Sequence, residues 1–281
     1  MKSFENRVAA ITGASSGIGR ALALELAAKK CNLALSSNSN QTGLAETASL
    51  AEMHGVKVTT ARVDVAQREQ VYAWAADVMA QHGRVNLVIN NAGVAHAGTV
   101  AGTDLEDYEW VIGINFWGVV YGTKAFLPYL EAGGEGHIVN VSSIFGLFAQ
   151  PGMSAYNSSK FAVRAFTESL RQELDIARNG VSATCVHPGG VKTNIALSSR
   201  MSESMSQVTG SDAQKSRQDF ERLFRTTADQ AATAILAGVR RNARRVLVGF
   251  DAQAADCMQR LLPGAYQRLV TTGIRLNKAL T

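Results

Sequence analysis

Residues 8–19 read Val-Ala-Ala-Ile-Thr-Gly-Ala-Ser-Ser-Gly-Ile-Gly. The first four residues are apolar, as expected of a short buried strand. After the first glycines, Ile18, Leu22 and Leu26 recur every four residues, which is the spacing of one face of a helix. The stretch therefore predicts a strand, a glycine turn and a helix, in that order.

Each glycine of this turn has a distinct physical use. Gly13 permits a tight turn out of the strand, Gly17 lets the backbone approach a pyrophosphate, and Gly19 lets the helix pack closely on the sheet. The start of the helix then offers free N–H groups and a positive dipole end to phosphate. A turn that binds nothing is the alternative, but the strand and helix around it favour dinucleotide binding. A Walker-type phosphate loop is excluded because no Gly-Lys-Ser/Thr sequence follows.

Outward from this unit, short apolar runs alternate with longer stretches of helical period. Strands that are buried on both faces and separated by helices are typical of a parallel sheet. The sequence therefore predicts an α/β fold with a doubly wound, Rossmann-type parallel sheet. Further strands are expected at 33–35, 56–63, 85–89, 137–141, 181–186 and 245–250, and helices at 43–54, 67–82, 104–130, 154–177 and 228–239.

The composition is that of a folded chain with little charge. Of 281 residues, 46% are hydrophobic and 18% are charged, so the chain can bury a core and disorder as its main state is excluded. The net charge of +5 is diffuse until a group of arginines at 240–245, which lacks the interleaved aromatics of a nucleic-acid site. We expect no nucleic-acid partner.

The cysteines and apolar runs bear on the compartment. Cys31, Cys185 and Cys257 are widely spaced and form no CxxC pair, which argues against disulfides and against a thiolate metal site, so no metal is expected. No secretory signal pattern is seen at the start, and no apolar run approaches the ~18 residues of a spanning helix. We therefore expect a soluble, cytoplasmic chain with no membrane partner.

We expect one domain over residues 1–281. Residues 4–193 would form the cofactor site and catalytic core, and 228–281 the C-terminal helices, the last strand and a tail. Between them, residues 194–227 are rich in serine and short of aromatics, so a flexible substrate lid is expected after the sixth strand.

The Gly-xxx-Gly-x-Gly spacing of the turn resembles the classical branch of the short-chain dehydrogenase/reductase family. Three further segments resemble elements of that family, in the same order along the chain. They are the pair Asp64-Val65, which in the family holds the adenine edge, the Asn90-Asn91-Ala92-Gly93 element that borders the adenine ribose, and Pro188–Thr193, which fixes the nicotinamide carboxamide. The resemblance covers about residues 4–193 and, more loosely, 228–250.

Tyr156 and Lys160 stand four residues apart, hence on one face of a helix. A nearby cation favours the phenolate and so moves a tyrosine pKa toward neutrality, which makes the pair useful for acid-base chemistry. For an isolated pair, a solvated helix surface is the simpler interpretation. The resemblance reverses that balance: it implies that Tyr156 is the acid-base residue and that Lys160 supports it and holds the nicotinamide ribose.

The resemblance also assigns two polar partners. Ser143 lies 13 residues before Tyr156, the family's usual separation, and would hydrogen-bond the substrate oxygen. Asn115 matches the family's helix asparagine, which retains a water next to the lysine in a proton relay; its alternative is a polar residue that breaks the local helix. The implied activity is hydride transfer between a nicotinamide and a ketone or secondary alcohol.

The choice of nicotinamide cofactor depends on the end of the second strand. Ser37 stands where users of NAD generally place an aspartate that repels a 2′-phosphate, and Asn38 and Ser16 stand where users of NADP often have a basic residue. NADP is favoured, and NAD or dual use is the alternative. The full set expected to bind the cofactor is Gly13, Ser15, Ser16, Gly17, Ile18, Gly19, Ser37, Asn38, Asp64, Val65, Asn91, Ala92, Gly93, Tyr156, Lys160, Pro188, Gly189, Val191 and Thr193.

The residues expected around the substrate are mostly apolar, so a hydrophobic ketone or secondary alcohol is the expected substrate class. They are Val94, His96, Phe145, Gln150, Met201 and Met205. For His96, a packed or capping role is the alternative. The family implies a homodimer or homotetramer.

Two other functional classes fit the sequence less well. A regulator that binds NAD(P) without catalysis would be expected to lose Ser143, Tyr156 or Lys160, and all three are present. A dehydratase or epimerase of the extended branch would be expected to have a Gly-xx-Gly-xx-Gly turn and a larger C-terminal domain. Both expectations favour the oxidoreductase.

Overall fold

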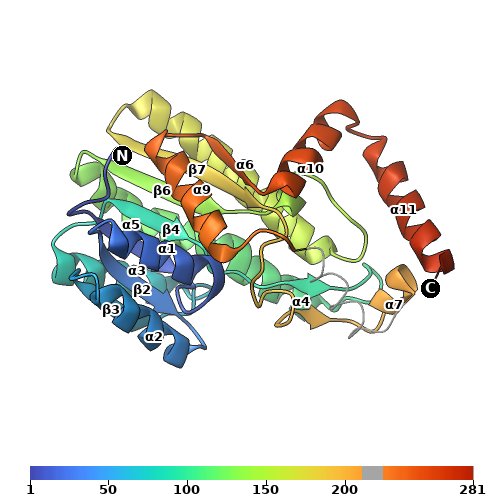
Figure 1. The fold of residues 1–281 in the computed structure, drawn as a ribbon, viewed down its shortest axis with the longest axis horizontal. Coiled ribbons are helices and arrows are strands. Elements are labelled where there is room, and N and C mark those ends of the chain that lie inside the picture. Colours follow the sequence, from blue (N-terminus) through green and yellow to red (C-terminus); the bar gives the residue numbers. More distant parts are fainter. Residues whose placement is uncertain (211–223, 281) are drawn as a thin grey trace.

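The computed structural model describes residues 1–210 and 224–280, and it has the predicted α/β architecture. Seven parallel strands form one sheet in the order β3-β2-β1-β4-β6-β7-β9 (Figure 1). The strands are β1 Val8–Thr12, β2 Asn32–Ser37, β3 Val58–Arg62, β4 Leu87–Asn90, β6 Gly136–Val141, β7 Val181–Pro188 and β9 Arg245–Val248. The doubly wound sheet in a single domain is therefore confirmed.

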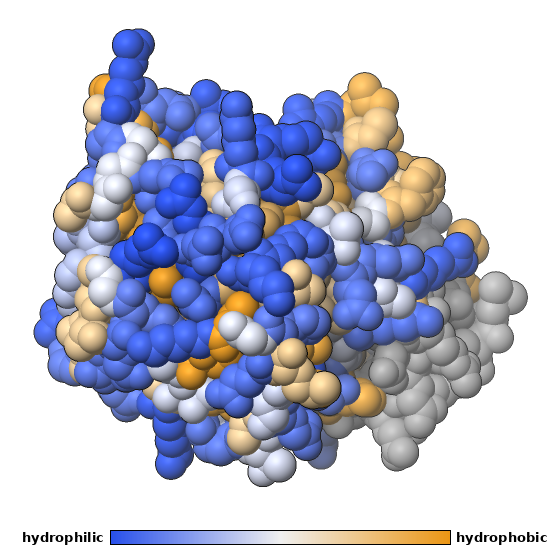
Figure 2. Space-filling model, turned by 60° about the vertical axis from the view of Figure 1, so that its left-hand side comes forward, coloured by the Kyte–Doolittle hydropathy of each residue, from blue (hydrophilic) through white to orange (hydrophobic). Residues whose placement is uncertain are grey.

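Helices cover both faces of the sheet because successive strand residues point to opposite sides. Ala9 and Ile11 pack with α1 (Gly17–Ala28), α2 (Gln41–Glu52) and α9 (Ala228–Arg240), whereas Ala10 packs with α3 (Arg68–His82), α5 (Gly118–Ala132) and α6 (Ser154–Ala177). The surface in Figure 2 is mostly hydrophilic, with small apolar groups scattered over it. No described helix meets the length and hydropathy needed to cross a bilayer.

The helix expected over 104–130 differs from the prediction. It is divided into α4 (Leu105–Ile112), a π-helical turn over Gly113–Trp117, and α5. A π turn adds a residue to the helical repeat and changes the direction in which the following side chains point. Here the turn contains Asn115, which is fully buried.

The segment after β7 is partly ordered by short elements. β8 (Arg200–Met201) pairs with β5 (His96–Ala97), and α7 (Met205–Thr209) follows. The remainder of the predicted lid up to residue 223 lies outside the described residues. At the other end of the chain, α10 (Phe250–Leu261) and α11 (Tyr266–Leu280) form an arm that projects beyond the sheet and returns beside α7 (Figure 1).

Candidate active site

The glycine turn lies at the carboxyl end of β1, between β2 on one side and β4 on the other. This is the point at which the strand order reverses, where open α/β sheets bind ligands. Gly13 and Gly17 have φ angles of +67° and +54°, and a Cβ at Gly19 would lie 2.2 Å from the Gly13 carbonyl oxygen. No side chain caps α1, so its first-turn N–H groups face the turn without a side-chain acceptor. The turn therefore fits a phosphate.

The end of β4 is hydrogen-bonded to this turn. The Thr12 hydroxyl accepts hydrogen bonds from the backbone N–H groups of Asn91 and Ala92, each at 3.0 Å. The Asn91 amide in turn donates to the Thr12 carbonyl at 2.9 Å. These bonds fix the Asn-Asn-Ala-Gly element against the glycine turn. At the end of β3, the Asp64 carboxylate accepts from the Ala66 N–H at 3.0 Å, which holds the strand end in a tight turn.

The Pro188–Thr193 segment approaches the turn from β7. A Cβ placed on Gly17 would lie 3.1 Å from the Thr193 Cγ2, so the two positions face each other across a narrow gap. The Gly190 N–H donates to the carboxylate of Asp251, in the first turn of α10. The structure thus brings the segment expected to hold the nicotinamide beside the segment expected to hold the pyrophosphate.

The end of β2 contains no carboxylate. Ser37 is buried and donates its hydroxyl hydrogen bond to the Ser15 Oγ at 3.0 Å. Glu46 is the first acidic residue after this strand, and it pairs with Arg20 at 2.9 Å. Sequence reasoning missed Arg62, which is the register partner of Ser37 on β3 and is exposed to solvent. Its position near the end of the strand predicted over 56–63 was the available signal.

Tyr156 and Ser143 lie next to each other. The Ser143 hydroxyl hydrogen-bonds the Tyr156 phenol, and Ser143 Oγ also accepts from the Phe145 N–H at 3.1 Å. Burial raises the pKa of Tyr156 to about 12, and the bond to Ser143 acts in the opposite direction. At neutral pH the phenol therefore keeps its proton and can donate it.

Lys160 lies beside this pair on α6. Its Nζ is 5.6 Å from the centre of the Tyr156 ring and donates to the Val141 carbonyl at 3.0 Å. Burial lowers the pKa of Lys160 to about 8, so the ammonium is still the main form at pH 7. A Cβ at Gly93 would lie 3.5 Å from this Nζ, which shows how closely the end of β4 approaches the cation.

Asn115 contacts the same region through the backbone. Its Oδ1 accepts from the Val94 N–H at 2.8 Å, and its Nδ2 donates to the Val94 carbonyl and to Ser159 Oγ at 2.9 and 3.0 Å. The side chain thus fixes the segment after Gly93 in place against α6. Its predicted part in a proton relay stays a prediction.

The predicted substrate residues separate into two groups. Phe145 packs against Tyr156 with ring centroids 6.2 Å apart, and Met205 lies against Gly152, close to the same apolar cluster. Val94 is held by Asn115 through its backbone, and Gln150 donates to the Met153 sulfur at 3.2 Å.

The other group, His96 and Met201, lies in the short sheet of β5 and β8, which is joined to α4. The His96 ring is buried and its Nε2 lies 3.2 Å from the Asp107 carboxylate, so it points toward α4. Arg200 also pairs with Asp107, at 2.8 Å, and its guanidinium lies 3.8 Å from the centre of the Trp110 ring. Met201, next to Arg200, pairs with Ala97 across the short sheet.

Sequence reasoning missed the part of the site that comes from the C-terminal arm. Tyr266 of α11 packs its ring against Phe148 at 6.0 Å and accepts a hydrogen bond from the Ala149 N–H at 3.2 Å. Together with Ala255 it joins the apolar cluster that contains Tyr156. The helical spacing of the tail was visible in the sequence, but no local pattern indicated its packing partner.

Comparisons with known proteins agree with this geometry. A family model described as short chain dehydrogenase matches residues 7–204. The chain is 50% identical to the putative oxidoreductase SadH of Mycobacterium tuberculosis over 275 residues, 98% of this chain and 97% of that protein. It is 39% identical to human estradiol 17-beta-dehydrogenase 11 over 193 residues, 68% of this chain and 64% of that protein.

Two solved structures are similar over most of the chain. A short-chain dehydrogenase/reductase from Burkholderia phymatum in complex with NAD has a TM-score of 0.86 and 30% identity, covering 95% of this chain and 97% of that one. An alcohol dehydrogenase from the archaeon Thermococcus sibiricus, complexed with 5-hydroxy-NADP, has a TM-score of 0.71 and 27% identity, covering 86% and 95%.

Proposed function

The chain belongs to the short-chain dehydrogenase family of oxidoreductases, and on that premise we propose that it transfers hydride reversibly between NADP and a hydrophobic ketone or secondary alcohol, with Tyr156 as acid and base. The observation that carries the proposal is the buried group of Ser143, Tyr156 and Lys160 at the carboxyl end of the sheet. Ser143 follows β6, whereas Tyr156 and Lys160 lie one turn apart on α6, so two separate parts of the chain contribute to the group.

A bound nicotinamide cofactor supplies or accepts the hydride, and the glycine turn, the Asn-Asn-Ala-Gly element and the segment ending at Thr193 would hold it. The chain's own residues handle the proton. In reduction, the neutral Tyr156 phenol donates its proton to the carbonyl oxygen of the substrate while the Ser143 hydroxyl stabilises the charge developing on that oxygen. In oxidation, the phenolate removes the hydroxyl proton, and the Lys160 ammonium stabilises that phenolate.

The preference for NADP is supported by the charges at the end of β2. The 2′ position of the adenine ribose in folds of this kind lies at this strand end. Ser37 and Asn38 are uncharged, Glu46 is neutralised by Arg20, and Arg62 supplies a guanidinium on the adjacent strand. A phosphate of charge about −1.5 to −2 therefore meets donors and a cation there.

The hydrophobic substrate class is supported by the walls of the site. Phe145, Phe148, Met153 and Tyr266 are buried and belong to the same apolar cluster as Tyr156, and the Phe145 ring contacts the Tyr156 ring. Human estradiol 17-beta-dehydrogenase 11 is named for a steroid, which is also largely apolar. We further propose a homodimer or homotetramer; the half-exposed Trp117 on the α4–α5 side is available for contact, and light scattering on the purified chain would detect a monomer if this is wrong.

The Tyr156→Phe variant tests the proposed chemistry. Removal of one hydroxyl should lower kcat by at least about 100-fold, because proton transfer from a positioned group contributes roughly that much. Binding of NADPH, followed by its fluorescence, should persist, since the phosphate-binding turn is unchanged. Tyr72→Phe, at an exposed position on α3, is the matched control. Near-normal turnover by Tyr156→Phe, with ketones and alcohols assayed in both directions, would remove the assignment.

A further inference from the structure

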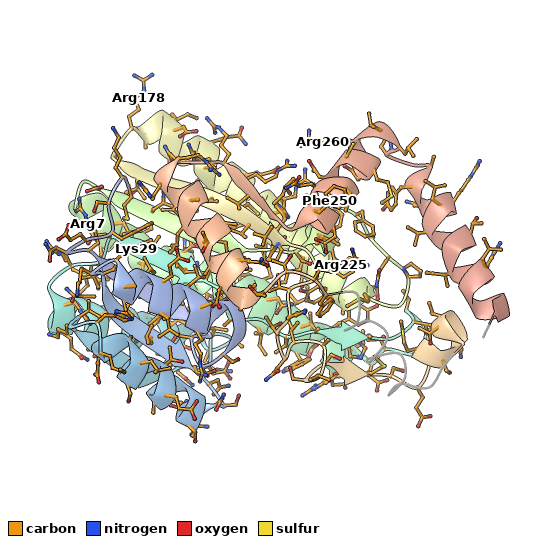
Figure 3. All side chains as sticks on the ribbon, in the orientation of Figure 1. Arg7, Lys29, Arg178, Arg225, Phe250 and Arg260 are labelled. Atoms are coloured by element: carbon orange, nitrogen blue, oxygen red, sulfur yellow. The ribbon has the colours of Figure 1, made fainter. Side chains whose placement is uncertain are left out.

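The C-terminal hairpin, defined as α10 and α11, carries a cluster of exposed large apolar side chains. Leu261, Leu269 and Leu276 are 74%, 55% and 62% exposed, although leucine is among the residues most often buried. Leu262, between the helices, is 40% exposed. Figure 3 shows the hairpin extending away from the sheet, with Arg260 near its outer bend. Exposed apolar side chains gathered on one arm indicate a contact surface.

The two faces of α11 have different environments. Tyr266 and Val270, four residues apart, point toward the body and pack in the cluster around Tyr156. Leu269 and Leu276, seven residues apart, form a second apolar stripe on another face of the same helix. The inner face already has a protein partner, whereas the outer stripe faces solvent in the described chain.

The charge around this stripe has a single sign. Residues 257–281 contain three arginines and one lysine but no aspartate or glutamate. Arg260 pairs with Asp256, whereas Arg268 and Arg275 have no ion-pair partner among the described residues. These two arginines are seven residues apart and lie one position before Leu269 and Leu276, so they form a basic stripe next to the apolar one.

We propose that the hairpin docks on an anionic lipid surface, with Leu261, Leu269 and Leu276 entering the apolar layer and Arg268 and Arg275 at the phosphates. Leucines beside a basic stripe on a helix of low mean hydropathy are typical of helices that lie along a membrane interface. A second copy of the chain fits the surface less well: two-fold pairing through this stripe would gather arginines from both copies, and residues 257–281 contain no carboxylate to pair with them.

This surface differs from a membrane span. The expectation of no membrane partner depends on the lack of a spanning segment, and a helix that lies on the surface needs none. Docking would also place the bilayer next to the substrate site, because the inner face of the same helix contributes Tyr266 to the apolar cluster around Tyr156. A cavity of about 290 Å³ lies between α7, α11 and Pro151 on this side, and the exposed Arg275 is one of its lining residues. Resting on the proposed function, this consequence points to lipophilic alcohols or ketones dissolved in the bilayer.

Vesicle flotation of the full chain tests the docking without any need for turnover. Binding is expected to vesicles of phosphatidylcholine with phosphatidylglycerol, to be weak on phosphatidylcholine alone, and to decrease with salt. Arg268→Gln combined with Arg275→Gln should weaken partitioning about 30-fold, at about 1 kcal/mol for each basic residue at an anionic surface. Leu269→Ser combined with Leu276→Ser should weaken it at least about tenfold.

Matched variants distinguish binding through this surface from non-specific binding of vesicles to exposed apolar or basic side chains. Leu50→Ser with Met53→Ser removes two exposed apolar side chains at the end of α2, and Arg240→Gln with Arg241→Gln removes two arginines at the end of α9. Both should leave vesicle binding unchanged, and circular dichroism should show every variant folded. Equal loss in these controls, or no preference for anionic vesicles, would overturn the proposal.

Two further outcomes are informative. If the leucine variant changes the oligomer size measured by light scattering and the wild type binds no vesicles, the stripe is a contact between copies and the lipid proposal is wrong. If vesicle binding is found but no ketone or alcohol turns over, the proposed function fails while the docking stands.

Discussion

Ser37→Asp is the sharpest test of how this chain selects its cofactor. The Ser37 side chain is 7% exposed and its Oγ lies 3.0 Å from Ser15 Oγ, at the end of β2. An aspartate there can accept a hydrogen bond from the Ser15 hydroxyl, so the substitution places a carboxylate at this point and replaces the bond that Ser37 donates to Ser15 with one in the opposite direction. That carboxylate would accept from a ribose 2′-hydroxyl and repel a 2′-phosphate.

The expected magnitude follows from Coulomb's law at a partly buried site. Unit charges about 6 Å apart interact by about 3 kcal/mol at an effective dielectric constant of about 20. Physiological salt reduces this by about half, and the phosphate carries about −1.5 to −2 charges, which gives a penalty of about 2 kcal/mol. In addition, a charged hydrogen bond from the 2′-hydroxyl of NAD to the new carboxylate should strengthen NAD binding by about 1.5 kcal/mol. The ratio of kcat/KM for NADP to that for NAD should therefore fall about 300-fold.

The assay is steady-state kinetics with both cofactors, using one substrate for wild type and variants. Ser37→Asn is the matched control, because asparagine has the size of aspartate without its charge, and its ratio should stay within about fivefold of wild type. A ratio within threefold of wild type for Ser37→Asp would show that the adenine ribose does not lie at the end of β2. The prediction concerns a change in the ratio, so it holds whichever cofactor the wild type prefers.

Three other substitutions test the structure around the site. Burial lowers the pKa of His187 to about 4. Because this lies below the unfolded value of about 6.5, the neutral ring stabilises the fold above pH 6.5, and that contribution is lost as the pH falls toward 4. In the wild type, His187 should lower the free energy of unfolding by about 2 kcal/mol between pH 7 and pH 5. The His187→Asn variant should lose less stability than the wild type over this range, by about that amount, as measured by urea denaturation at both pH values. An equal loss in both proteins would contradict this. Gly19→Ala places a Cβ 2.2 Å from the Gly13 carbonyl oxygen, so it should lower the free energy of unfolding by about 1–3 kcal/mol and weaken cofactor binding. Gly273→Ala, whose Cβ would lie in open space, should not lower the stability. Arg200→Gln removes the contacts between β8 and α4 and should raise KM for an apolar substrate by up to about fivefold with a smaller effect on kcat, because about 1 kcal/mol of ion-pair and cation–π energy is lost. An unchanged KM would show that β8 needs no such anchor.

The parallel sheet could be predicted because its determinants are local. The apolar run before Gly13 and the four-residue spacing after it are each contained within one element, so periodicity detects them. The π turn around Asn115 could not be detected in this way. An inserted residue leaves the helical spacing of apolar residues intact on both sides of the turn, so periodicity predicts a single helix over 104–130.

The parts of the site that were missed depend on contacts between distant residues. The hydrogen bond from Ala149 to Tyr266 joins positions 117 residues apart, and the register pair of Ser37 and Arg62 joins two separate strands. A hydrophobic pattern shows that a helix has an apolar face but does not show which surface covers it. His96 illustrates the same limit, because its contact with the Asp107 carboxylate depends on how α4 packs against β5.

Burial sets the protonation state of the two side chains to which the proposed reaction assigns the proton chemistry, Tyr156 and Lys160. Burial disfavours the charged form of both side chains, raising the pKa of Tyr156 to about 12 and lowering that of Lys160 to about 8. At pH 7 only about one phenol in 10⁵ is ionised, while most of the lysine is still an ammonium. The chain alone therefore holds a proton donor next to a cation, the combination needed to protonate and stabilise an oxygen that gains negative charge. In the proposed oxidation, the phenol must first lose its proton, and burial disfavours the resulting phenolate.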